Sequence, residues 1–116
     1  MDRQSKDAEK LDMICGKVAD CYRRIYGDAV KGVYLYGSYA RGDYDEESDI
    51  DFAAIVDGDR RELQDKMYQL WDASAELDLA FDVVISATVI PASEYVKYKP
   101  HLRYYQNIEK EGRRIA

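Results

Sequence analysis

The sequence predicts an α/β (α+β) fold, in which helices pack on a small mixed β-sheet of about three or more strands. Three observations support this fold class. Apolar residues recur at helical spacing near the N-terminus, two later segments are rich in β-branched and apolar residues, and helical and strand-like segments then alternate along the chain. Such alternation is typical of a sheet with helices packed on it.

The first half of the chain contains the clearest elements. Over about Ser5–Tyr26 the apolar side chains follow a helical period. Val30–Tyr36 is β-branched and aromatic, which predicts a strand. Tyr39–Arg41 predicts the start of a short helix with Ser38 as its N-cap. Asp49–Val56 becomes wholly apolar after an acidic start, which is typical of a mostly buried strand.

The second half is predicted to contain three helices and a third strand. Arg60–Leu77 carries an apolar stripe at helical spacing, and we expect its Trp71 in the core. Phe81–Ser86 predicts the third strand. A short helix is expected near Ala92–Tyr98, and a last helix over about His101–Glu111.

Length and composition limit the classes of protein to consider. The 116 residues are 47% apolar and 34% charged, which is typical of a globular chain that can bury a real core. We expect one domain over residues 1–116. No apolar run is as long as a membrane span needs, and residues 1–10 are too polar for a signal peptide. We therefore expect a cytoplasmic protein that has no membrane partner.

The net charge of −6 comes almost entirely from one segment, because six acids and one base lie between Arg41 and Asp51. A chain with this balance is not expected to hold nucleic acid by attraction to its phosphates. Closely spaced carboxylates repel one another, and a bound cation would relieve that repulsion. A solvated acidic turn is the plainer alternative, and it explains most such runs.

Two short patterns in this region carry chemistry. Gly37-Ser38 follows a predicted strand and precedes a predicted helix, where backbone amides and a hydroxyl suit a phosphate, with Arg41 in reach of the same anion. An ordinary tight turn is the alternative for this pair. Asp49 and Asp51 stand two apart in a predicted strand, so both carboxylates project from one face. A hard cation such as Mg²⁺ would offset their repulsion.

A third carboxylate follows in the next predicted strand. Asp82 is flanked by apolar residues, and an unpaired carboxylate is costly to bury. If the two strands are neighbours, Asp82 joins Asp49 and Asp51 on one face. Three carboxylates beside a phosphate-binding turn make a site for phosphoryl or nucleotidyl transfer with one or two metal ions.

The spacing of these residues resembles that of a known family. Gly37-Ser38, ten intervening residues and Asp49-x-Asp51 match the Gly-Ser-x10-Asp-x-Asp signature of the DNA polymerase β-like nucleotidyltransferase superfamily. The string GSYARGDYDEESDIDF closely resembles its small bacterial members, the minimal nucleotidyltransferases. The resemblance covers most of the chain, including Phe81–Val84, where the family has its third carboxylate, and Tyr105–Gly112, which is similar to its closing helix. Some members continue into a longer strand, whereas only Arg113–Ala116 follow here, so the closure of that sheet edge stays open.

The resemblance implies a role for each position. Gly37 and Ser38 would bind the β- and γ-phosphates of a nucleoside triphosphate, and Arg41 would help to neutralise them. Asp82 would also activate the acceptor hydroxyl. Three residues would be catalytic and hold the Mg²⁺ or Mn²⁺ ions: Asp49, Asp51 and Asp82.

The implied reaction moves a nucleoside monophosphate, AMP from ATP, to an acceptor hydroxyl. The resemblance further implies the antitoxin of a toxin–antitoxin pair, whose partner is a small helical HEPN ribonuclease silenced by adenylylation of a tyrosine. Two alternatives stay open: an antitoxin of this fold that acts by binding alone, and transfer to a small molecule such as an aminoglycoside. Transfer to RNA is disfavoured by the net charge of −6. The tyrosines near the C-terminus suit an interface, so a homo-oligomer is a further expectation.

Overall fold

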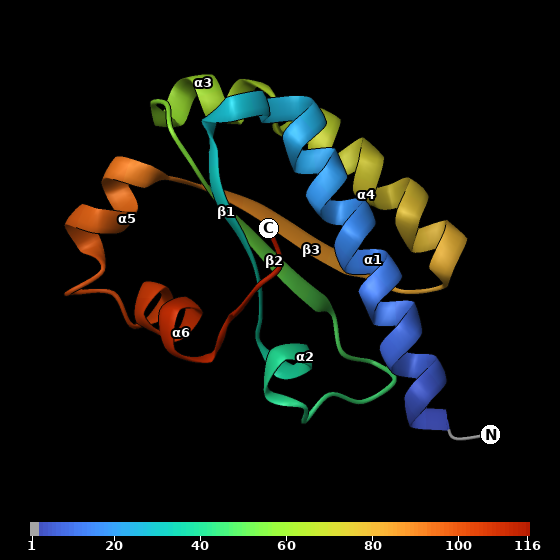
Figure 1. The fold of residues 1–116 in the computed structure, drawn as a ribbon. Coiled ribbons are helices and arrows are strands. Elements are labelled where there is room, and N and C mark those ends of the chain that lie inside the picture. Colours follow the sequence, from blue (N-terminus) through green and yellow to red (C-terminus); the bar gives the residue numbers. More distant parts are fainter. Residues whose placement is uncertain (1–2) are drawn as a thin grey trace.

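Figure 1 shows the computed structural model, which describes residues 3–116, with the side chains from residue 7 on. Its centre is a four-stranded sheet in the order β3-β2-β1-β4. The strands are β1 Val30–Tyr36, β2 Ile50–Val56, β3 Ile85–Pro91 and β4 Arg113–Arg114. β2 runs antiparallel to β1 and parallel to β3, and β4 runs antiparallel to β1. The predicted mixed sheet with packed helices is confirmed.

Helices cover both faces of this sheet. They are α1 Arg3–Tyr26, α2 Ser38–Arg41, α3 Arg60–Asp65, α4 Met67–Phe81, α5 Ala92–Tyr98 and α6 Arg103–Glu111. In Figure 1, α1 and α4 lie on one side of the strands and α6 lies on the other, while α2 sits at the end where β1 stops. Over residues 3–116, no helix combines the length and the apolar character that crossing a membrane requires.

The central strand β2 has buried side chains on both of its faces. Ile50 and Phe52 belong to the larger core, which they share with Ile14 and other residues of α1. Ala53 points the other way, into a smaller core with Ile108 of α6. Coverage on both sides explains why β2 is almost wholly apolar. Full burial of a side chain such as Phe52 contributes about 1.5–3 kcal/mol.

The C-terminal tail closes the sheet edge that the sequence left open. Arg113 and Arg114 of β4 pair with Leu35 and Tyr34 of β1. The pairing continues past β4, because the Val33 amide donates to the Ala116 carbonyl and the Ile115 amide donates to the Val33 carbonyl. Even this short tail therefore covers the free edge of β1.

The predicted helix over Arg60–Leu77 is wrong in one respect, because α3 ends at Asp65 and α4 begins at Met67. The helix α4 presents one side to the core, and consecutive residues of a helix point about 100° apart. Leu70 and Ala73 are buried, whereas Trp71 is 59% exposed and lies outside the core where it was predicted.

The third strand also begins later than predicted, at Ile85 rather than at Phe81. Leu77 and Phe81 are one helical turn apart, and both pack on the main core from α4. Phe81, the first residue of the expected strand, is therefore the last residue of this helix. The chain then turns at Asp82, and the Asp78 carboxylate accepts a hydrogen bond from the Ile85 amide.

Candidate active site

Most of the sequence-predicted residues meet at one end of the sheet. Gly37 and Ser38 directly follow β1, and Asp49 directly precedes β2. Because the two strands are antiparallel, the end of β1 lies beside the start of β2, and Tyr36 is the register partner of Asp51. We call the group formed by Gly37, Ser38, Arg41, Asp49 and Asp51 the carboxylate site.

Gly37 is required by both its backbone and its neighbour. Its φ of +74° lies in a region that side chains rarely tolerate. A Cβ built on it would also collide with Oδ2 of Asp51. Glycine here lets the backbone at the end of β1 approach the Asp51 carboxylate directly.

The turn after Gly37 forms the short helix α2. The amides of Ala40 and Arg41 both donate to the Gly37 carbonyl at 3.1 Å, and the Gly42 amide donates to the Ser38 carbonyl at 2.8 Å. Gly37 is therefore the N-cap, and the prediction that Ser38 would cap this helix is wrong. Ser38 lies in the first helical turn, where amides have no partner within the helix.

The two carboxylates that flank Ile50 influence each other. Burial raises the pKa of Asp51, which is half-buried, and the negative charge of the exposed Asp49 raises it further. The positive charge of Arg41 acts in the opposite direction on Asp51. The pair of carboxylates is therefore under mutual repulsion that a cation would relieve.

Arg41 connects α2 to the C-terminal end of α6 through an ion pair with Glu111. Its Nε lies 3.3 Å from Oδ2 of Asp43, and one terminal nitrogen lies 3.2 Å from Oε2 of Glu111. These hydrogen bonds raise the pKa of Arg41, which keeps its positive charge. The guanidinium is thus held at a partly exposed position from which its charge acts on Asp51.

A pair of tyrosines beside Asp51 was not predicted to belong here. The hydroxyls of Tyr36 and Tyr104 are 2.8 Å apart, and the two rings meet edge to face. Burial is the main cause that raises the pKa of each phenol, and the Asp51 carboxylate adds to it. Only the register that sets Tyr36 opposite Asp51 could have signalled this placement.

Asp82 does not lie where the sequence predicted. It follows the last turn of α4 with φ +53°, ahead of β3, and the residue of β3 that pairs with Asp51 is Ser86. In the described part of the chain, no three acids, histidines or cysteines form a group that could hold a metal ion. The expected three-carboxylate face is therefore not formed, because α4 extends to Phe81 and delays the strand.

Comparison with known proteins identifies the family. The family of nucleotidyltransferase domains matches residues 15–115. The chain belongs to this family. The resemblance to nucleotidyltransferases seen in the sequence is thereby confirmed, and the chain is an enzyme of this class.

Two relatives of this nucleotidyltransferase come from Methanocaldococcus jannaschii, and both carry the name "Putative protein adenylyltransferase". One is 36% identical over 88 residues, which cover 76% of this chain and 80% of the relative. The other is 38% identical over 65 residues, which cover 56% of this chain and 64% of the relative.

Solved structures share the fold of this nucleotidyltransferase. One is a crystal structure of a toxin–antitoxin with AMP-PNP, with a TM-score of 0.57 and 20% identity over 88% of this chain and 72% of that chain. Another is the toxin–antitoxin MntA-HepT, with a TM-score of 0.50 and 18% identity over 91% of this chain and 70% of that chain.

The donor set of the nucleotidyltransferase suits a hard divalent cation. Asp49 and Asp51 supply carboxylate oxygens, which Mg²⁺ and Mn²⁺ prefer. Mg²⁺ commonly takes one or two protein carboxylates and completes its shell with substrate phosphates and water. Two carboxylates under mutual repulsion, one of them in close contact with the Gly37 backbone, fit that pattern.

Proposed function

We propose that this nucleotidyltransferase moves AMP from ATP to a hydroxyl group of another protein at the carboxylate site. The observation that carries the proposal is the direct approach of the Gly37 backbone to the Asp51 carboxylate. A phosphate held at Gly37 and a cation held by Asp51 would then be neighbours. The two relatives named as protein adenylyltransferases support the choice of AMP and of a protein acceptor.

The phosphate groups of ATP would lie against the turn between β1 and α2. The amide and hydroxyl of Ser38 are donors in the first turn of α2, and Gly37 brings this turn against the Asp51 carboxylate. Arg41 would add positive charge from its partly exposed position near Asp51. Its present partners, Asp43 and Glu111, hold the guanidinium at that place.

Asp49 and Asp51 would hold Mg²⁺ or Mn²⁺. Such a cation, when bound, neutralises charge on the phosphates and on the leaving pyrophosphate. Asp82 is left out of this proposal, because it ends α4 instead of sharing the strand face of the other two acids. Its role as a metal ligand stays a prediction, which the Asp82→Asn variant tests.

The transfer itself is a substitution at the α-phosphorus. The acceptor oxygen forms a bond to that phosphorus, the bond to the bridging oxygen breaks, pyrophosphate leaves and the hydroxyl proton is released. The protein contributes by holding the phosphates and the carboxylates in a fixed arrangement, which is how enzymes accelerate this class of reaction.

The acceptor we propose is a tyrosine of a small helical HEPN-type ribonuclease toxin, for which this chain would be the antitoxin. This finer assignment is supported by the toxin–antitoxin complexes that share the fold. It is also supported by charge, because the acidic segment that precedes Asp51 suits a basic, RNA-binding protein. An adenylate near the active site of such a toxin would place negative charge where RNA phosphates bind.

Co-expression with a HEPN-type toxin from a gene adjacent to that of this chain tests the proposal. The intact mass of that protein is expected to rise by whole adenylate units with the wild-type chain and to stay unchanged with Asp51→Asn. If the partner is neutralised at unchanged mass, the chain acts by binding alone. Modification of an added aminoglycoside instead of the protein would favour a small-molecule acceptor.

A further inference from the structure

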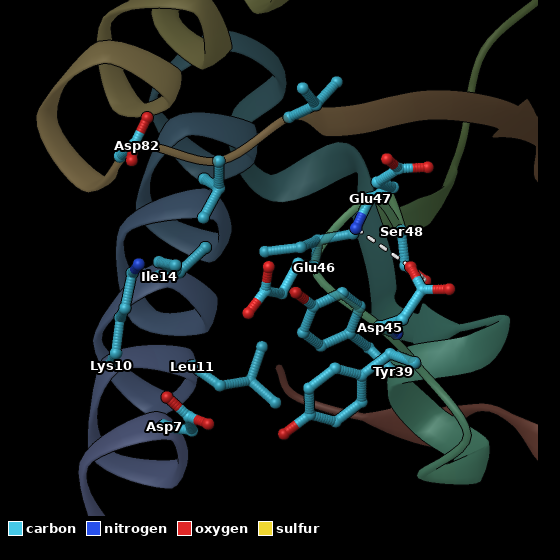
Figure 2. Close-up of a pocket in the computed structure, with 14 residues that line it drawn as sticks. Asp7, Lys10, Leu11, Ile14, Tyr39, Asp45, Glu46, Glu47, Ser48 and Asp82 are labelled. Atoms are coloured by element: carbon cyan, nitrogen blue, oxygen red, sulfur yellow. Dashed lines mark hydrogen bonds between the residues drawn. The ribbon is translucent and has the colours of Figure 1, made fainter. Parts of the chain in front are cut away.

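An open cleft lies on the opposite side of β2 from the carboxylate site. It has a volume of about 660 Å³ and is bounded by α1, by the loop that leads from α2 to β2, and by the segment from Asp82 to Val84. Figure 2 shows α1, with Asp7 and Lys10, on one side, and the loop with Asp45 and Glu47 on the other. Ile50 lines this cleft, whereas the acids on either side of it in sequence belong to the carboxylate site.

The lining of the cleft is strongly negative. Among the residues whose side chains the structure describes, the lining holds one base, Lys10, and five acids: Asp7, Asp45, Glu46, Glu47 and Asp82. These acids come from three separate segments, and no group of three in the described residues could hold a metal ion. The distribution therefore suits a ligand with several separated positive charges, and it repels a triphosphate.

Apolar surface runs between these charges. Leu11 of α1 lines the cleft above the buried Ile14, and Val84 in its lining is 57% exposed. Tyr39 and Tyr44 form another part of the wall, with their rings stacked at 4.1 Å between centroids and 7° between planes. A stacked aromatic wall beside aliphatic side chains offers contact area that a small polar cation would leave uncovered.

We propose that this acidic cleft binds a basic segment of the acceptor protein that also carries apolar side chains. This inference rests on the proposed function, because it assigns a binding site to the acceptor protein of that reaction. Ser48 lines the cleft, and the next residue, Asp49, belongs to the carboxylate site, so one loop connects the two. A segment bound in the cleft holds its protein beside the nucleotide, and the opposite charges speed and orient the encounter.

A peptide-binding measurement tests the cleft without any transfer reaction. The probe is a fluorescein-labelled peptide of alternating lysine and leucine, titrated by fluorescence anisotropy in the absence of ATP and metal. The cleft variant is Asp7→Lys/Glu47→Lys. Its matched control is Asp20→Lys/Glu76→Lys, which makes the same change of net charge at exposed positions outside the cleft lining.

The cleft variant is expected to bind the peptide about tenfold more weakly than the wild type, while the matched control stays within about twofold. Equal losses in both variants would overturn the inference, because binding would then follow net charge alone. Equal binding of a glutamate–leucine peptide would also overturn the inference. Self-association of the wild-type chain that is lost in the cleft variant would overturn it too, because a second copy of the chain would then occupy the cleft.

The two proposals can fail separately. Peptide binding that is lost in the cleft variant, in a chain that transfers no AMP, supports the cleft and refutes the proposed function. Transfer of AMP to the partner, with no binding of the lysine–leucine peptide, supports the proposed function and refutes the cleft inference. Thermal melts of both double variants confirm that each is folded before the titrations are compared.

Discussion

Gly37 and Asp51 approach each other so closely across the β1–β2 pair that a Cβ on residue 37 would collide with Oδ2 of Asp51. This contact joins the two halves of the Gly-Ser and Asp-x-Asp pattern in space. The half that suits a phosphate and the half that suits a cation are adjacent because β1 ends where β2 begins.

Gly37→Ala is expected to destabilise the fold and abolish transfer. The backbone at Gly37 has φ +74° and ψ −154°, a region that is almost restricted to glycine and costs about 1–3 kcal/mol for other residues. The added methyl group would also displace the Asp51 carboxylate. Urea titrations and an assay of AMP transfer measure the two effects.

Gly42→Ala is the matched control for this variant. Gly42 also has a positive φ, +88°, but a Cβ there would have no atom within 4 Å. Its free energy of unfolding is expected to fall by about 1 kcal/mol while transfer is retained. If Gly42→Ala lost transfer as completely as Gly37→Ala, backbone strain rather than the contact with Asp51 would explain the effect.

Asp51→Asn is expected to stabilise the ligand-free chain at neutral pH. Burial and the charge of Asp49 raise the pKa of Asp51 above its ordinary value of 3.8. An acid with a raised pKa in the folded state weakens the fold once it is ionised, and this penalty vanishes as the pH falls below the ordinary value. The gain in unfolding free energy should therefore disappear in acid.

Mg²⁺ and ATP together should reverse that order of stability, because they stabilise only the intact carboxylate site. Urea titrations at neutral and acidic pH, with and without these ligands, measure both changes. A loss of ligand-free stability at neutral pH in Asp51→Asn would mean that this carboxylate is held by structural hydrogen bonds.

Arg41→Gln is expected to raise the KM for ATP by about tenfold, because a charged hydrogen bond to phosphate is lost. The free energy of unfolding should change by less than about 1 kcal/mol, since the ion pairs of Arg41 are exposed. Glu111→Gln is the control, because it removes a partner of Arg41 and keeps the guanidinium. Equal rises of KM in both variants would show that Arg41 acts through its contact with α6.

Asp82→Asn should reduce transfer far less than Asp51→Asn. Asp82 has φ +53° at the end of α4, and asparagine tolerates this conformation, so the fold is preserved. Steady-state rates of AMP transfer at saturating Mg²⁺ compare the two variants. An equal loss of transfer in both variants would show that Asp82 belongs to the metal site, and that the start of β3 moves when the metal binds.

Local patterns were sufficient for part of the fold. The strand Val30–Tyr36 and the helix Ala92–Tyr98 have the predicted bounds, because each pattern lies between clear turn residues. The nucleotide motif was readable for a related reason. Gly37 and the two acids of Asp49-x-Asp51 are close in sequence, so one strand pair is enough to bring them together.

The start of β3 could not be read locally. Phe81 and the valines after it fit a strand by composition, but Phe81 also continues the helical period of Leu77. Because both side chains pack on the core from one side of a helix, α4 continues to Phe81. Asp82 therefore follows the helix and lies outside the sheet. The exposure of Trp71 has another origin, because Leu70 and Ala73 occupy the core side of α4 and Trp71 points about 100° away from Leu70 around the helix.

The contacts that α6 makes could not be predicted from local sequence patterns either. Tyr36 and Tyr104 are 68 residues apart, and Arg41 and Glu111 are 70 apart. Both pairs exist because the smaller core seats Tyr105 and Ile108 of α6 against the sheet. The Tyr39–Tyr44 stack, by contrast, joins two residues that flank the motif, and the sequence marks both as aromatic.

Transfer of a labelled phosphate tests the central claim most directly. The purified chain, the helical partner protein and Mg²⁺ are incubated with ATP labelled either at the α- or at the γ-phosphate. The α-label is expected to appear on a partner tyrosine with the wild-type chain and with the distant control Asp20→Asn, and to be absent with Asp49→Asn or Asp51→Asn. Transfer of the γ-label, or undiminished α-label transfer by Asp51→Asn, would contradict adenylyl transfer at the carboxylate site.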